Sequence, residues 1–324
     1  MLSRNAEGLY WIGRYLERAR HGCRLLSDQL ATMEDRPVEE IDQGWRRLYR
    51  AVHRTPLGGF LASGEEGEDF MLADAYTMAD DLTFEPGNPD SIRNCLAAAR
   101  ENARQVRNIL GVRMWDCLNL AYLDIRDIGI ETIWNDQPDA FYLRTEDAIR
   151  TFSGIAVSSM YRDDGWHFLW LGWFVERTQL LAGLIDAHLA QYPTAAQHSE
   201  SDWRALLRIC EAHVAYRHLH SHSHRPGRMV DFLVADPLLA HSVRHALARV
   251  TEALDAVSTG RTLAIVAGRR AGWMAAAIDY DWPNRDPVDD DATRAALRDV
   301  RDSCLLLHED IAATYFHYEI VDAP

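Results

Sequence analysis

A stripe of charged side chains near the start of the chain has the chemistry needed to hold a carboxylate or a phosphate. Each residue of an α-helix turns the chain by roughly 100°, which places Arg4, Glu7, Trp11, Arg14 and Arg18 along one side of a helix. Guanidinium groups bind such anions through paired hydrogen bonds. We therefore predict a ligand-binding groove here, with Asn5 at its edge. A buried structural network and a plain salt-bridged surface are the alternatives.

A second polar set lies within residues 99–107. Arg100, Arg104 and Arg107 fall on one side of a helix, and like charges at this spacing repel unless acids or an anion neutralise them. Glu101 falls on another side of the helix and does not obviously do so. We add Arg100, Asn102 and Arg104 to the candidate ligand-binding residues.

The candidates for acid–base and metal chemistry are few. Glu7 and Glu17 could act as a general base if they are buried. Alternate histidines at His220, His222 and His224 could bind a metal if the segment is extended, but no second ligand cluster accompanies them. The sequence has no phosphate-binding glycine loop and no nucleophile elbow. We therefore expect neither a metal site nor a cofactor.

The helices that must position these residues are repeated. The run from Trp11 to Arg18 matches the run that begins at Trp170, 159 positions later, with Trp, Gly, Glu and Arg identical in register. Two more pairs of segments follow in the same order: 69–74 resembles 231–236, and 89–96 resembles 240–247. The sequence thus predicts two duplicated, pseudo-symmetric halves, about 1–155 and 156–324, within one domain spanning 1–324.

The duplication helps to distinguish structural residues from candidate functional residues. The residues kept in both copies are expected to form the structural frame, with glycines allowing close helix approach and Glu-Arg pairs bridging the halves. These structural residues are Gly13, Glu17, Trp170, Gly172, Glu176 and Arg177. The second copy carries Trp166 and Trp173 where the first has Glu7 and Arg14. Residues that only the first copy has are therefore the better candidates for function.

Helical periodicity dominates the chain, and strand-like alternation is almost absent. We predict an all-α fold, a single large helical bundle. The predicted helices span 3–32, 39–53, 68–82, 90–110, 113–134, 138–159, 165–190, 199–219, 228–234, 238–257, 260–281 and 290–320.

Composition excludes several classes of protein. A net charge of −15 argues against a nucleic-acid-binding surface. The five cysteines are odd in number and contain no Cys-x-x-Cys pair, which argues against a disulfide framework. The most apolar stretch, residues 166–189, is interrupted by Glu176, Arg177 and Asp186, so no membrane span is expected. The N-terminus does not read as a secretory signal, and we expect a cytoplasmic protein.

The opening residues 1–19 closely resemble the signature of the alpha-E family, bacterial all-helical proteins of poorly defined function. Residues 99–104 resemble the internal Ala-Arg-Glu-Asn-Ala-Arg motif of that family. Residues 225–233 together with 242–244 resemble its second-half motif. The resemblance covers essentially the whole chain.

The resemblance implies a functional context. Alpha-E proteins commonly accompany a circularly permuted ATP-grasp ligase and a transglutaminase-like protease, and ATP-grasp enzymes join carboxylates to amines through acyl phosphates. The expected role is a partner or co-catalytic component of a system that makes or modifies peptide-like amides, with an arginine-rich groove for a carboxylate or acyl intermediate. A stand-alone enzyme that forms or cleaves amide bonds and a non-catalytic assembly scaffold remain the alternatives.

Overall fold

The structure is a computed structural model, and it describes residues 1–33, 37–56, 68–135, 137–192, 194, 198–220, 225–258, 264–285 and 290–316. All regular secondary structure in these ranges is helical, and no β-strand occurs in them. The prediction of an all-α fold is confirmed. None of these helices combines the length and the apolar character that crossing a membrane requires.

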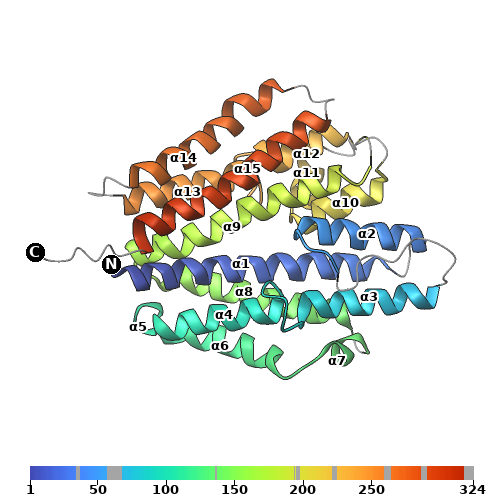
Figure 1. Ribbon diagram of the computed structural model, residues 1–324, viewed down its shortest axis with the longest axis horizontal. Coiled ribbons are helices and arrows are strands. Elements are labelled where there is room, and N and C mark those ends of the chain that lie inside the picture. Colours follow the sequence, from blue (N-terminus) through green and yellow to red (C-terminus); the bar gives the residue numbers. More distant parts are fainter. Residues whose placement is uncertain are drawn as a thin grey trace, which may run out of the picture.

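Two long helices form the centre of the molecule. α1 (Ser3–Ala31) and α9 (Asp164–Leu189) lie side by side, dark blue and yellow-green in Figure 1. They run in the same direction, because the amino group of Met1 lies 3.3 Å from Asp164 at one end while Glu17 meets Arg177 further along. α9 is buried on almost every side, as expected of a helix that is apolar all round.

The remaining helices cover this central pair from both sides (Figure 1). α4 and α8 pack on α1, and α6 lies across both; α13 and α15 pack on α9, and α14 lies outside them. The bounds are α2 Val38–Ala51, α3 Glu68–Thr83, α4 Ile92–Gln105, α5 Arg107–Leu110, α6 Val112–Arg126, α7 Ile130–Trp134, α8 Pro138–Ser159, α10 Glu200–Ile209, α11 His213–His220, α12 Pro226–Ala235, α13 Val243–Val257, α14 Ala264–Ala276 and α15 Asp290–Ile311. Their buried apolar side chains form one contiguous core.

Two glycines set the distance between α1 and α9. A Cβ atom on Gly172 would overlap the backbone carbonyl of Tyr10, and one on Gly13 would overlap the carbonyl oxygen of Leu169. The two backbones are therefore in direct contact, and neither position has room for a side chain. This contact brings the polar residues that follow on α1 and α9 within reach of each other.

Several predicted helices are divided in the structure. The segment predicted as 113–134 becomes α6 and α7, and Gly111, at φ 76°, separates α6 from α5. The segment predicted as 199–219 breaks at Glu211, which has φ 52° and separates α10 from α11. α14 continues into the π-helical turn η2 (Ala277–Asp281) and the 3-10 turn η3 (Trp282–Asn284). Periodicity alone does not register a single residue that leaves helical geometry.

Candidate functional site

The predicted stripe on α1 does not form one surface. Arg4 is exposed, whereas Asn5, Glu7 and Trp11 are partly buried. Arg14 is only 3% exposed because α9 covers its side of the helix. Its guanidinium donates to Glu176, to the Tyr10 hydroxyl at 3.0 Å and to Gln179 Oε1 at 3.2 Å.

Arg14 and Arg18 share one buried carboxylate. Arg18 donates from Nε to Glu176 Oε1 at 2.7 Å and from Nη2 to Glu176 Oε2 at 3.2 Å, and it also pairs with Asp90. Burial alone would raise the pKa of Glu176, but the two guanidinium groups outweigh it and lower that pKa to about 2. Glu176 is therefore ionised at any physiological pH.

A cavity of about 290 Å³ opens beside this carboxylate, between α1, α2 and α9. Of the stripe residues, Arg18 alone is in its lining. The other polar lining residues are His21, His53, Arg54, Asp90, Glu176 and Gln179, and the apolar ones include Leu25, Leu26, Leu48, Val52, Leu82 and Leu180. We call this region, formed by Arg14, Arg18, Glu176 and the cavity, the open centre.

Two nitrogen atoms on residues of this lining lack hydrogen bonds. His21 is 4% exposed, and its Nε2 has no partner among the described residues. Burial, reinforced by Arg24, lowers the pKa of His21 to about 3, so the ring is neutral. Arg54 Nε is likewise buried without a partner in the described part of the chain, and its Nη2 lies 3.9 Å from Asp81. Leaving buried polar atoms unpaired costs about 1–3 kcal/mol each, which a bound polar group would offset.

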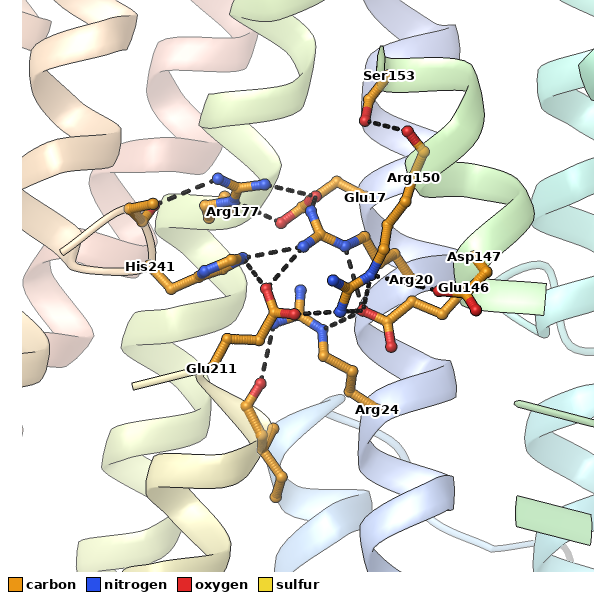
Figure 2. Close-up of polar contacts among 12 residues, drawn as sticks. Glu17, Arg20, Arg24, Glu146, Asp147, Arg150, Ser153, Arg177, Glu211 and His241 are labelled. Atoms are coloured by element: carbon orange, nitrogen blue, oxygen red, sulfur yellow. Dashed lines mark hydrogen bonds and ion pairs between the residues drawn. The ribbon is translucent and has the colours of Figure 1, made fainter. Parts of the chain in front are cut away.

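A second polar centre surrounds the contact of Glu17 on α1 with Arg177 on α9 (Figure 2). Glu17 accepts hydrogen bonds from Arg177 at 2.6 and 3.0 Å. Burial would raise the pKa of Glu17, but Arg177 and Arg20 outweigh it and lower that pKa. A carboxylate held ionised in this way is a poor general base, so the structure favours a structural role for Glu17 over a catalytic one.

Three further arginines complete this centre. Arg20 contacts Glu146 at 3.4 Å and Glu211 at 2.9 Å. Arg24 donates to the Ile209 carbonyl at 2.9 Å. The full set, which we call the filled centre, is Glu17, Arg20, Arg24, Glu146, Arg150, Arg177, Glu211 and His241. Burial and then Arg177 lower the pKa of His241 well below its ordinary value, so its ring is neutral here.

The candidates on α4 lie outside the cavity lining. Arg100 donates to Asn119 at 2.7 Å and lies 5.1 Å over the ring of Tyr122. Asn102 bonds to the carbonyl of Ala98 on its own helix. Arg104 pairs with Glu101 at 2.6 Å, so the expectation that Glu101 cannot neutralise this set was wrong. The long side chains reach each other across the three positions that separate them.

The histidine candidates for a metal are not brought together with other ligands. His220 packs its ring against Tyr216 and Phe232, while His222 and His224 lie outside the described residues. Within the described part of the chain, no group of three or more potential metal ligands occurs.

Sequence reasoning missed most of the cavity residues, although one signal was available. The run Trp45-Arg46-x-Leu48-x-Arg50 on α2 recurs as Trp203-Arg204-x-Leu206-x-Arg208 on α10. Each run is followed by a residue with positive φ, His53 at 54° and Glu211 at 52°. A side chain in this left-handed conformation is uncommon outside glycine and frequently marks a functional position. His53 borders the open centre, and Glu211 belongs to the filled centre.

Comparison with known proteins identifies the family of this chain. It belongs to the Alpha-E family: the family model, described as a predicted alpha-helical domain with a conserved ER motif, matches residues 1–316. Glu-Arg occurs twice in the chain, at 17–18 and 176–177, and both pairs lie in the centres described above.

Relatives occur among mycobacterial proteins. An uncharacterised protein of Mycobacterium bovis and one of Mycobacterium tuberculosis are each 27% identical to this chain over 223 residues, a match that covers 64% of this chain and 24% of the relative. The chain thus spans about a quarter of the length of these relatives. No solved structure matches the chain.

Proposed function

We propose that this Alpha-E protein is a partner or co-catalytic component of an ATP-grasp amide-ligase system that makes or modifies peptide-like amides. In this proposal the cavity of the open centre holds the carboxylate end of a peptide or an acyl intermediate. The ligase partnership is what the family resemblance implies. In the mycobacterial relatives the matched segment is about a quarter of a longer chain, so there it is covalently joined to further sequence.

The observation that carries the binding proposal is a cavity lined by two residues, His21 and Arg54, that each have a buried nitrogen without a hydrogen-bond partner among the described residues. Arg54 has a buried Nε without a partner among the described residues and only a long contact to Asp81. A carboxylate is the acceptor that a guanidinium binds best. The leucines around it suit the aliphatic part of the same ligand. Arg54 therefore replaces Arg4, Arg14 and Arg104 as the principal anion-binding residue of the proposal.

We also infer that the chain arose by duplication of a helical unit. The two Glu-Arg pairs bond reciprocally across the α1–α9 contact, Glu17 with Arg177 and Arg18 with Glu176. This reciprocity is what a two-fold relation between the halves would give. The repeated run on α2 and α10, with a left-handed residue after each, supports the same inference.

The binding proposal is tested by calorimetry with a matched pair of probes, N-acetyl-leucine and N-acetyl-leucine amide. They differ in the carboxylate, so the wild-type protein should bind the acid about tenfold more tightly if a guanidinium receives it. Arg54→Gln should abolish this preference, and Leu180→Trp, which fills the cavity, should weaken both probes. Arg104→Gln, on the exposed part of α4, is the control that leaves binding unchanged.

The partnership is tested separately by co-expression with a circularly permuted ATP-grasp ligase. The wild-type protein and Arg54→Gln should both co-purify with the ligase, and only the wild type should support formation of amide product. Equal binding of the two leucine probes would contradict the cavity proposal. Failure to co-purify would contradict the partnership alone.

A further inference from the structure

A second cavity, of about 330 Å³, lies between α14, its continuation η2–η3, and α15. Its floor is apolar, since Met274, Ile278 and Val300 are each at most 5% exposed. It shares no lining residue with the cavity of the open centre. Whatever binds here is therefore independent of the carboxylate site.

Two tryptophans form the walls of this cavity. Trp282 is buried, whereas Trp273 is 73% exposed, an unusual position for the largest aromatic side chain. The helix between them turns through the π-helical segment Ala277–Asp281. Such segments are rare and occur frequently at functional sites. An exposed indole beside a π-helical turn suggests a surface kept for a ligand rather than for the core.

The rim of the cavity carries negative charge. Asp281 and Asp299 are exposed lining residues, and neither pairs with a cation in the described part of the chain. Arg285, the basic residue of the lining, is held elsewhere: it donates to Asp231 at 2.6 Å and to Thr293 at 3.1 Å. It also lies 3.7 Å over the ring of Trp282. The two rim carboxylates thus remain available to a ligand.

We propose that this cavity binds a primary alkylammonium group, as carried by a lysine side chain or a free diamine. The faces of tryptophan rings attract cations, and the rim carboxylates pair with the ammonium group. The apolar floor accommodates the methylene stem of such a ligand. An anion would be repelled by Asp281 and Asp299, and a neutral apolar ligand would use the floor alone.

The test uses the full chain and two probes that differ in one group. Nα-acetyl-lysine methylamide carries the ammonium group, and Nα-acetyl-norleucine methylamide ends in a methyl group instead. Calorimetry should show about tenfold tighter binding of the lysine compound, an advantage that shrinks at high salt because exposed charges are screened. The double variant Asp281→Asn/Asp299→Asn should reduce the preference to within about twofold, and Trp273→Ala should weaken binding of the lysine compound.

Matched controls locate the effect. Asp255→Asn removes an exposed carboxylate outside the cavity, and Tyr280→Ala removes an aromatic ring that is 72% exposed but absent from the lining. Both should bind as the wild type does. Cadaverine distinguishes the source of the amine: tighter binding of cadaverine assigns the cavity to free diamines, and tighter binding of the lysine compound assigns it to lysine side chains. Equal affinity for the lysine and norleucine compounds, no binding at millimolar concentration, or an unchanged preference in the double variant would overturn the proposal.

Discussion

The open centre and the filled centre differ in what surrounds the ion pair between α1 and α9. In both, a Glu-Arg pair of one central helix bonds to that of the other (Figure 2 shows the filled centre). In the filled centre, Arg20 and Arg24 of α1 occupy the space next to this pair. The α9 positions 159 residues later hold Gln179 and Gly183, which are smaller. Gln179 lines the cavity, so a side chain shorter than that of Arg20 accompanies the open space on this side.

The largest effect should come from removing the carboxylate at the open centre. Glu176→Gln removes the carboxylate partner of the buried Arg14 and leaves the half-buried Arg18 with Asp90. Breaking a buried ion pair from one side costs about 3–5 kcal/mol. We expect the free energy of unfolding, measured in urea, to fall by that amount.

A matched substitution on the surface provides the control for this prediction. Glu101→Gln removes the exposed partner of Arg104 on α4. Exposed pairs contribute little because water screens them, so the unfolding midpoint should not change measurably. If Glu176→Gln lowered the free energy of unfolding as little as Glu101→Gln does, Arg14 and Arg18 would not depend on Glu176 to balance their charge.

The filled centre should respond differently to the loss of a charge. Arg24 lies 3.3 Å from Glu146 and 3.8 Å from Glu211, while burial together with repulsion from Arg20 lowers its pKa. Arg24→Met keeps most of the side-chain volume and leaves Glu146 and Glu211 paired with Arg20 and Arg150. The lost hydrogen bond to Ile209 costs about 1–3 kcal/mol, and relief of the repulsion offsets part of it.

We therefore expect Arg24→Met to lower the free energy of unfolding by about 2 kcal/mol or less, measured in the same urea titration. The informative quantity is the difference between Arg24→Met and Glu176→Gln in the loss of unfolding free energy. A loss as large as that of Glu176→Gln would mean that the filled centre needs all four arginines, and that Arg24 is not merely occupying space.

The sequence predicted the two central helices better than the surroundings of their side chains. α1 and α9 were expected at 3–32 and 165–190, and they span Ser3–Ala31 and Asp164–Leu189. Long, strongly periodic helices with a repeated motif leave little ambiguity. Periodicity cannot say which side of α1 is covered by α9, so the burial of Arg14 was not predictable from the helix alone.

The cavity was beyond sequence reasoning for a related reason. It exists where α1, α2 and α9 meet, and its lining includes His21 of α1 and Arg54 of the segment that follows α2. Neither residue belongs to a motif, and neither stands out by its spacing. A void between helices depends on side-chain lengths, such as that of Gln179 where the matching position of α1 holds Arg20, and a shorter side chain produces no pattern.

Acid should weaken the open centre through His21. Its folded-state pKa of about 3 lies below the ordinary value of 6.5, so the unfolded chain takes up the proton first as the pH falls. Stability is therefore complete above pH 6.5 and is lost between pH 6.5 and pH 3, at about 1.4 kcal/mol per pH unit for one proton. His21→Gln should flatten the pH dependence of the unfolding free energy between pH 6 and pH 4 by up to that slope. An unchanged slope would show that His21 is not neutral in the folded protein.

The smallest effect should come from Gly183, the α9 residue that corresponds by spacing to Arg24. A Cβ atom here would lie 3.1 Å from His53 Nε2 and 3.3 Å from the Ala51 carbonyl. The His53 ring is exposed and can shift, and alanine favours the helix over glycine by about 1 kcal/mol. Gly183→Ala should therefore change the free energy of unfolding by less than about 1 kcal/mol. Gly172→Ala on the same helix is the contrast, because its methyl group would meet backbone atoms that cannot move aside. If Gly183→Ala destabilised the protein as Gly172→Ala does, glycine would be required there for close packing of α9 against Ala51 and His53.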